Sequence, residues 1–514
     1  MGMSLASWEH KQMHPTQQQQ PRAFWSLGFG IRFRNHITWF LLTLSLLYII
    51  YSSNLLLTNE HRNLNCYSTH LSSSSQFLPI SNSNTNSNSN SNSFTTTSTA
   101  IKPTELKHIV FGIAASSNLW ERRKQYIKQW WKPRETRGMV WLDKSVRNRG
   151  NEGLPEIRIS GNTSTFPYTN RKGSRSALRI SRVVSEMARL GMKDVRWFVL
   201  GDDDTVFVVD NVVRVLSKYD HRQFYYVGSS SESHIQNLFF SYAMAYGGGG
   251  FAISYPLAKA LEKIQDRCIH KYPGLYGSDD RMQACMAELG VPLTREAGFH
   301  QYDLHGDLLG LLSAHPVAPL VSLHHLDVVE PIFPGMSRAT AIQHLFESIR
   351  LDSASIMQQS ICYDKNREWS IIVSWGYVVQ ILRGAISPRE LEMPTRTFIN
   401  WHRRADYSAY AFNTRPVSKH PCEKPHIFYM NTTRYDRVKK QTLVIYSRRS
   451  PEPYCNWKMD SPGAIDSIIV VKRPDHLRWQ KSPRRDCCRV LPSSKRSTMY
   501  LSVGNCQDGE IWEL

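Results

Sequence analysis

Apolar runs that alternate with helix-like segments predict the fold of the first half of the chain. Continuous apolar runs at His108–Ala114, Met139–Leu142 and Val195–Leu200 are typical of buried strands. Between these runs, Trp120–Trp131 is helix-like, and Arg175–Leu190 carries apolar residues close to helical spacing. Strands that alternate with helices predict an α/β fold with a mixed, mostly parallel sheet flanked by helices.

Beyond about residue 350 the pattern changes. Short apolar runs such as Ile371–Val373 and Thr442–Tyr446 lie among many prolines and six of the nine cysteines. This composition predicts a smaller, β-rich C-terminal region braced by disulfides. The predicted organisation is a cytosolic tail (1–36), a transmembrane helix (37–57), a stem (58–104), an α/β domain (105–345) and the cysteine-containing β-rich region (350–514).

The predicted transmembrane helix is an uncharged stretch of about 20 residues, which is enough to cross a bilayer once. Arg22, Arg32 and Arg34 precede it, so the positive-inside rule places the N-terminus in the cytosol and the rest of the chain in a lumen. A single type II signal anchor is favoured over a cleaved signal peptide, because the run is long, starts late and lacks a clear cleavage site. Residues 68–100 consist mainly of Ser, Asn and Thr and predict a flexible stem, because they have almost nothing to bury.

Charge and cysteine usage narrow the possible partners. The formal net charge is +20, but the basic residues are scattered, and no zinc-finger, RRM-like or basic-zipper pattern occurs. We therefore expect no nucleic-acid partner, and the excess charge fits a diphosphate substrate or an acidic surface better.

The absence of a CxxC pair argues against structural zinc. In an oxidising lumen the cysteines would form disulfides, and the sequons at Asn162 and Asn431 are consistent with that compartment.

Three adjacent aspartates, Asp202, Asp203 and Asp204, follow the apolar run at Val195–Leu200. Adjacent carboxylates repel one another unless a cation or water screens them. Mg²⁺ and Mn²⁺ bind carboxylate oxygens and also bridge phosphate oxygens. Because ligands bind at the carboxyl ends of parallel strands, this position favours a metal site. The alternative is a solvated acidic turn that caps the next helix.

Three further segments carry candidate chemistry. The glycine run 247–250 allows a ligand or another backbone to approach closely, although a flexible loop has the same composition. Ser278 is followed by Asp279 and Asp280, and acidic residues in the first turn of a helix are also favoured by the helix dipole alone. In LHHLD, adjacent histidines on a strand would point to opposite faces, so one of them is expected to enter a site.

These motifs occur together in the order and approximate spacing of a known family. Residues 105–335 resemble the Fringe-like β-1,3-glycosyltransferases, in particular a plant branch labelled only as a domain of unknown function. The resemblance rests on HIVFGIAASSNLWERRKQYIKQWW, WFVLGDDDTVF, GGGGFAIS, SDDRMQACMAELG and LHHLD. It implies a GT-A-like fold, Mn²⁺ or another divalent cation, and inverting transfer from a UDP-sugar to a glycan or glycoprotein hydroxyl through a β-1,3 linkage. With the predicted anchor, it implies a Golgi membrane protein whose catalytic body lies in the lumen.

The resemblance also assigns roles to individual residues. Asp280 matches the catalytic base of the family. The expected metal ligands are Asp204, Asp202 and His325. The expected donor-binding residues are Asp143, Asp202, Asp203, Gly248, Gly249 and Gly250. The sequence departs from the family at Arg281, which directly follows the expected base and would lower its basicity, and in a longer connection from Asp280 to His325.

Two other functions compete with this interpretation. The segment from Asp202 to Val206 also fits the signature of aspartate-nucleophile phosphatases, but the later acidic pair that this class needs is missing after Asp279 and Asp280. The second alternative is a catalytically inactive relative that binds glycans or acts as a scaffold in the Golgi. Such a scaffold need not bind UDP in a metal-dependent way.

Overall fold

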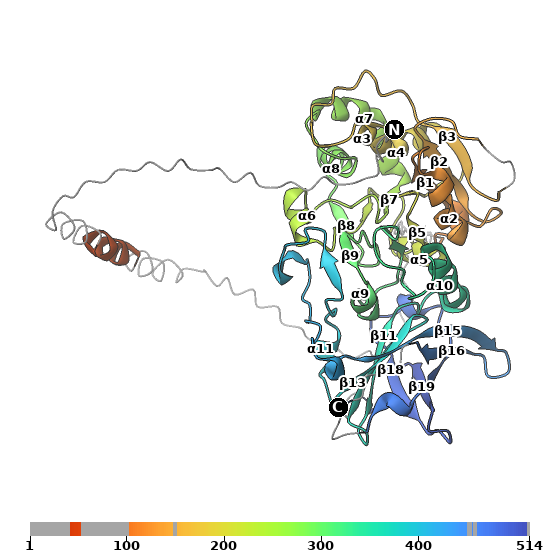
Figure 1. Ribbon diagram of the computed structural model, residues 1–514. Helices are drawn as coiled ribbons and strands as arrows, with labels where there is room; N and C mark the ends of the chain where they lie inside the picture. The colour runs from red at the N-terminus through yellow and green to blue at the C-terminus, as the bar shows by residue number, and fades with distance from the viewer. Residues whose placement is uncertain (1–41, 53–101, 148–151, 450–454, 456–459, 511–514) are drawn as a thin grey trace, which may run out of the picture. The chain divides into compact units, whose positions relative to one another are not determined.

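The computed structural model describes residues 42–52, 102–147, 152–449, 455 and 460–510 (Figure 1). Residues 42–52 are helical and lie within the predicted transmembrane helix. Across the described ranges, no helix has both the length and the apolar character that crossing a membrane requires. The rest of the stretch 37–57, the predicted tail (1–36) and the predicted stem up to residue 101 lie outside the described residues.

A seven-stranded mixed sheet forms the first half of the described body, in the order β3-β2-β1-β4-β7-β6-β8. Its strands are β1 (Ile109–Ala114), β2 (Arg137–Leu142), β3 (Glu156–Ile159), β4 (Trp197–Asp202), β6 (Tyr226–Gly228), β7 (Phe251–Ser254) and β8 (Leu293–Arg295). The ladders β2–β3, β1–β2, β1–β4 and β6–β8 are parallel, whereas β7 runs antiparallel to β4 and β6. The predicted mixed, mostly parallel sheet is therefore confirmed.

Helices cover both faces of this sheet (Figure 1). The helices of the described body are α2 (Trp120–Trp130), α3 (Ser176–Ser181), α4 (Val183–Arg189), α5 (Val209–Leu216), α6 (His234–Phe239), α7 (Tyr255–Lys271), α8 (Asp279–Glu288), α9 (Leu309–Ser313), α10 (Arg338–Asp352) and α11 (Pro388–Leu391), and among them α2, α4 and α7 pack on this sheet. Every residue of β1 is buried, because one face of the sheet packs against α4 and α7 and the other against α2. The single helix predicted over Arg175–Leu190 is instead two helices that meet at Arg182, whose guanidinium binds Asp266 of α7.

The C-terminal half is a closed sheet of eight strands, in the order β11-β12-β13-β15-β16-β17-β19-β18. The strands are β11 (Gln359–Asp364), β12 (Trp369–Ser374), β13 (Val378–Arg383), β15 (His426–Asp436), β16 (Gln441–Arg448), β17 (Ser467–Lys472), β18 (Cys487–Leu491) and β19 (Thr498–Gly504). It closes where Ile361 of β11 pairs with Cys487 of β18. Disulfides join Cys362 to Cys488, Cys422 to Cys455 and Cys487 to Cys506. The predicted β-rich character and the disulfides are thus present.

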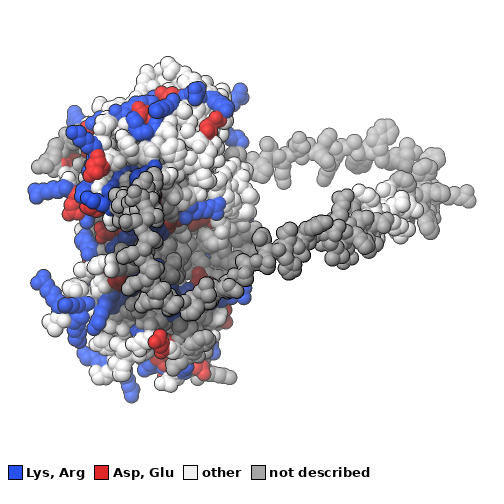
Figure 2. Space-filling view, turned by 180° about the vertical axis from the view of Figure 1, so that it is seen from behind, with Lys and Arg blue, Asp and Glu red and all other residues white. Residues whose placement is uncertain are grey.

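Two short two-stranded ladders lie outside the two large sheets. β9 (Leu304–Gly306) pairs with β14 (Phe398–Asn400), and β5 (Val206–Phe207) pairs with β10 (Ser322–Leu323). One cluster of buried apolar side chains extends from the mixed sheet into the closed sheet. The two halves therefore share a continuous core. On the face seen in Figure 2, Lys and Arg side chains are spread over the surface with Asp and Glu among them.

Candidate active site

Asp202 is the last residue of β4, and Asp203 and Asp204 begin the turn that follows it, at the carboxyl ends of the parallel strands β1 and β4. The amide of Asp202 donates to Thr205 Oγ1 at 2.7 Å, and this hydroxyl donates to the carbonyl of Gly248 at 2.7 Å. Trp130 Nε1 of α2 donates to the carbonyl of Thr205 at 3.1 Å. The glycine segment and α2 therefore hold the turn in place from two sides.

Asp202, Asp204 and His324 form a candidate metal group, since their ligand atoms lie within 4.8 Å of one another. His324 Nε2 is 3.2 Å from Asp204 Oδ1 and 3.8 Å from Asp202 Oδ2. Asp204 is fully buried, and among the described residues neither of its carboxylate oxygens has a hydrogen-bond partner. Carboxylate and imidazole donors suit Mn²⁺ and similar cations. The residues at this position therefore fit a divalent cation.

Burial and neighbouring charges shift the pKa values of the side chains in this group. Burial by itself lowers the pKa of His324, but the adjacent Asp204 raises it to about 9. Burial opposes ionisation of Asp204, yet His324 and Arg123 hold its pKa well below the usual range. Burial raises the pKa of Asp202 to about 7. His324 thus carries a proton that a metal ion must displace in order to bind there.

His325, the expected metal ligand, lies outside this group. Its Nδ1 is 3.1 Å from the carbonyl oxygen of Tyr302 and 3.5 Å from Asp303 Oδ1, and its ring stacks on Trp401. The backbone of His325 has a φ of 53°, in the left-handed region that is uncommon for residues other than glycine. The geometry therefore favours His324 over His325 as the ligand.

Arg123 of α2 contacts the aspartate turn and was not singled out from the sequence. Its Nη1 is 2.9 Å from Asp203 Oδ1, and its Nη2 is 3.1 Å from Asp204 Oδ2 and 2.8 Å from Asp327 Oδ2. Asp203 also accepts the amide of Ser116 at 3.1 Å. Asp203 is therefore engaged in holding the turn, and its contacts do not favour the expected donor-binding role. Only the position of Arg123 inside the WERRKQYIKQWW motif indicated that it has a function.

A small pocket lies beside the candidate metal group. Its walls come from β1, α3, α4, β4, β7 and α8. The acidic side chains that line it are Asp202 and Asp279, and the glycine segment contributes Gly247. Because Asp202 belongs to both, the pocket and the metal group form one site.

Asp279 and Asp280 begin α8 and have different surroundings. Asp279 lines the pocket, and burial raises its pKa to about 6. The carboxylate of Asp280 accepts the backbone amides of Tyr276, Gly277 and Arg281 at 2.6, 2.9 and 2.9 Å. Asp280 is not among the described residues that line the pocket. The geometry therefore favours Asp279 over the expected Asp280 as the carboxylate that faces a substrate.

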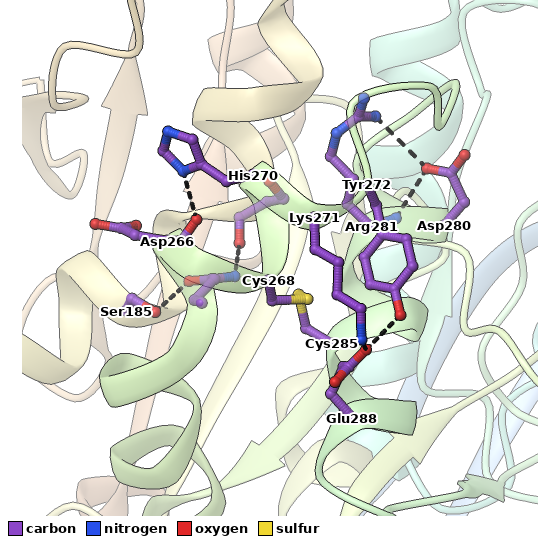
Figure 3. Close-up of a disulfide and its surroundings, with 12 residues drawn as sticks. Ser185, Asp266, Cys268, His270, Lys271, Tyr272, Asp280, Arg281, Cys285 and Glu288 are labelled. Carbon is purple, nitrogen blue, oxygen red and sulfur yellow. Dashed lines mark hydrogen bonds and ion pairs between the residues drawn. A yellow bond between two sulfur atoms is a disulfide. The ribbon is translucent and has the colours of Figure 1, made fainter. Parts of the chain in front are cut away.

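Figure 3 shows how α8 is held against α7. The disulfide between Cys268 and Cys285 joins the two helices. Arg281, which was expected to weaken Asp280 as a base, is buried, and its Nη1 lies 3.8 Å from Asp280 Oδ1. Its guanidinium donates to the carbonyls of Gly277 and Leu275. Arg281 thus fixes the loop that precedes α8.

The glycine segment 247–250 packs directly against the site. A Cβ atom added at Gly247 would lie 2.6 Å from Asp279 Oδ1, and one at Gly248 would lie 2.0 Å from His324 Cε1. Side chains at these positions would displace both groups, so the close approach requires glycine. The expected contact of Gly248–Gly250 with a donor stays a prediction.

Asp143 ends β2 at the same edge of the sheet. It accepts the amide of Ser117 at 2.7 Å and the Ser117 hydroxyl at 3.0 Å. Burial opposes ionisation, but these hydrogen bonds hold the pKa of Asp143 below its usual range. Asp143 is exposed and does not belong to the pocket lining, so its expected contact with the nucleotide also stays a prediction.

Comparison with known proteins agrees with the motifs. Residues 104–327 match the model of the Fringe-like family, and residues 236–488 match a protein family of unknown function, DUF604. A human beta-1,3-glucosyltransferase is 22% identical over 200 residues, which cover 39% of this chain and 36% of the relative. A mouse beta-1,3-glucosyltransferase is 30% identical over 142 residues, which cover 26% of this chain and 27% of the relative. The chain thus spans about a third of the length of these relatives.

Solved structures of glycosyltransferases show only a distant likeness. The galactosyltransferase LgtC in complex with donor and acceptor sugar analogues is 16% identical, with a TM-score of 0.27 over 46% of this chain and 94% of that chain. An active-site mutant of LgtC is 15% identical, with a TM-score of 0.29 and the same coverage. TM-scores this low do not establish a shared fold. The two family matches are more specific, and they confirm the resemblance of this chain to the Fringe-like β-1,3-glycosyltransferase family.

Proposed function

We propose that this protein is a metal-dependent, inverting glycosyltransferase with a GT-A-like domain. It transfers a sugar from a UDP-sugar to a hydroxyl group of a glycan or glycoprotein and forms a β-1,3 linkage. The observation that carries the proposal is the placement of Asp202, Asp204 and His324 beside a pocket that also contains Asp279. This arrangement lies inside the segment that matches the Fringe-like family.

The first part of the site would bind the diphosphate of the donor. Asp204, Asp202 and His324 would hold Mn²⁺ or another divalent cation, which neutralises the negative charge that develops on a departing diphosphate. Burial of Asp204 strengthens this interaction, because electrostatic attraction is larger where water is excluded. Gly247 and Gly248 keep the wall of the site free of side chains.

The second part of the site would activate the acceptor. An inverting transfer needs one base that removes the proton of the attacking hydroxyl group. Asp279 lines the pocket, and its pKa of about 6 leaves it ionised at neutral pH while keeping it a stronger base than an exposed aspartate. We therefore place the base at Asp279. Asp280, which accepts three backbone amides, would fix the start of α8.

The cellular location is part of the same proposal. The disulfides in the described residues favour an oxidising compartment. A single-pass type II protein of the Golgi membrane, with its catalytic body in the lumen, is consistent with them.

The direct test uses the purified full-length chain and a panel of UDP-sugars. We expect donor hydrolysis that requires Mn²⁺ and stops when EDTA is added. The Asp204→Asn substitution should reduce turnover by a factor of about 10² to 10³, because it removes a charge that acts on the leaving group. Unchanged turnover in this variant would overturn the metal assignment. A scaffold protein, by contrast, would show no Mn²⁺-dependent affinity for UDP in calorimetry.

A further inference from the structure

The side chain of Arg123 is buried at the candidate metal group, with only 7% of its surface exposed. It contacts Asp203 and Asp204 in the turn after β4, and Asp327 in the segment after β10. A guanidinium beside a cation site needs an explanation, because two positive charges at short range repel each other.

The three contacts of Arg123 are not equivalent. Nη1 donates a hydrogen bond to Asp203 at 2.9 Å, and Nη2 and Nε donate to the same oxygen of Asp327 at 2.8 and 3.1 Å. The approach to Asp204 Oδ2 at 3.1 Å is an ion pair without hydrogen-bond geometry. Arg123 is therefore anchored by Asp203 and Asp327, and it acts on Asp204 through its charge.

Asp204 shows why a counter-ion is needed. Its side chain is 1% exposed, and its charged neighbours are His324 at 3.2 Å on one oxygen and Arg123 at 3.1 Å on the other. A buried carboxylate without a nearby positive charge would be strongly destabilising. His324 lies beside Oδ1 of Asp204, whereas Arg123 lies beside Oδ2.

We propose that Arg123 is a fixed internal counter-ion of the metal site, which stabilises the carboxylate turn of the metal-free protein and lowers its affinity for the divalent cation. The inference rests on the metal site of the proposed function. Because its hydrogen bonds go to Asp203 and Asp327, Arg123 stays in place when Asp204 binds a cation. Asp327 offsets the charge of Arg123 and so restores part of the affinity of the site for the divalent cation.

The proposal predicts opposite effects for two substitutions. Arg123→Met keeps the length of the side chain but removes its charge, so Mn²⁺ should bind about tenfold more tightly, which corresponds to about 1.4 kcal/mol. The same change should lower the melting temperature of the metal-free protein. Asp327→Asn leaves the charge of Arg123 less neutralised, so Mn²⁺ should bind several-fold more weakly. If Arg123 only shapes the turn, both substitutions should weaken Mn²⁺ binding.

The experiment measures Mn²⁺ binding to the full-length chain by electron paramagnetic resonance, and thermal unfolding in EDTA. Arg122→Met is the matched control, because Arg122 is 60% exposed on the same helix and reaches Asp327 only at 3.4 Å; it should change both readings little. Arg123→Lys keeps the charge and should recover part of the lost melting temperature. If Arg123→Met does not fold, unchanged or tighter Mn²⁺ binding by Asp327→Asn still overturns the proposal.

The outcomes separate this inference from the proposed function. If the wild-type chain binds Mn²⁺ and Arg123→Met binds it more weakly, only the counter-ion role is wrong. A wild-type chain that binds no Mn²⁺ would contradict the metal site and this inference together. A wild-type chain that binds Mn²⁺ but transfers no sugar would contradict the proposed reaction without contradicting the counter-ion role of Arg123.

Discussion

The two halves of the described body treat buried charge differently. In the closed sheet, Lys472 Nζ lies 2.9 Å from Asp486 Oδ2, and Arg478 contacts the same carboxylate, so this charge is directly paired and hydrogen-bonded. In the mixed-sheet half, Asp204 lies beside Arg123 and His324, but neither of its buried oxygens accepts a hydrogen bond from a described residue. A buried charge that is hydrogen-bonded to its partners is satisfied, whereas a buried carboxylate that accepts no hydrogen bond is retained at a cost in stability. The contrast supports the proposed site beside Asp204.

The largest expected effect distinguishes Asp279 from Asp280. If Asp279 is the base, Asp279→Asn should reduce sugar transfer by a factor of about 10² to 10⁴ while donor binding stays near the wild-type level. Asp280→Asn removes an acceptor of backbone hydrogen bonds, so it should mainly lower the melting temperature. Steady-state kinetics and thermal unfolding of the two variants provide the comparison. A larger loss of turnover in Asp280→Asn at equal folded fraction would return the role of base to Asp280.

The sequence predicted β1, β2 and β4 of the mixed sheet, because these buried strands are continuous apolar runs that depend on local composition, but it did not single out β3, β6, β7 and β8. It also predicted the aspartate turn, because the turn follows β4 directly. The resemblance assigned the histidine ligand to His325, whereas His324 lies with Asp202 and Asp204. The argument from alternating faces assumes a strand through both histidines. β10 ends at Leu323, and the positive φ of His325 turns the backbone there. The alternation rule therefore does not apply at this point.

Long-range contacts explain the other features that the sequence did not reveal. The guanidinium of Arg123 meets carboxylates that are 80 and 204 residues away along the chain. The closed sheet likewise depends on the pairing of β11 with β18 across more than a hundred residues. Neither contact has a local signature in periodicity or composition. The β-rich character of the C-terminal region has such a signature, and it was therefore predicted.

The second prediction concerns the paired charge of the closed sheet. Asp486→Asn leaves Lys472 without its carboxylate partner in a buried position, so the free energy of unfolding should fall by about 3–5 kcal/mol. Turnover per folded molecule should stay near wild type, because the closed sheet contributes no residue to the pocket lining. Denaturant unfolding with an activity measurement on the same sample checks both statements. A stable Asp486→Asn variant with reduced turnover would contradict the contrast between the two halves.

Two disulfides with similar sequence separations allow a matched comparison. Cys268–Cys285 spans 17 residues in the mixed-sheet half, and Cys487–Cys506 spans 19 residues in the closed sheet. Replacing either pair with alanine should lower the free energy of unfolding by a similar amount, about 3 kcal/mol. Only the first pair joins α7 to α8, which carries Asp279 (Figure 3). Turnover should therefore fall further in Cys268→Ala/Cys285→Ala than in Cys487→Ala/Cys506→Ala. Equal turnover in the two variants would show that the Cys268–Cys285 disulfide does not position the base.

The smallest expected effect is the pH dependence, and its sign differs between the halves. Burial raises the pKa of Asp279 to about 6, so a base at this position loses activity below that pH, by about fivefold from pH 6 to pH 5. The raised pKa of Asp279 means that the folded state binds the proton more tightly than the unfolded state. The contribution of Asp279 to stability therefore falls as the pH rises from the ordinary aspartate range through about 6.

Asp486 of the closed-sheet half has the opposite pH dependence. Burial also opposes the ionisation of Asp486, but Lys472 and Arg478 outweigh it and lower the pKa, so the contribution of Asp486 to stability is present above the ordinary range and is lost in acid. Asp279→Asn should therefore raise the stability at pH 7 relative to pH 4.5, whereas Asp486→Asn should lower the stability at pH 4.5 relative to pH 2.5. Unfolding experiments at the three pH values measure these differences, and a shift of the same sign in both variants would show that the two buried carboxylates are not held in opposite ways.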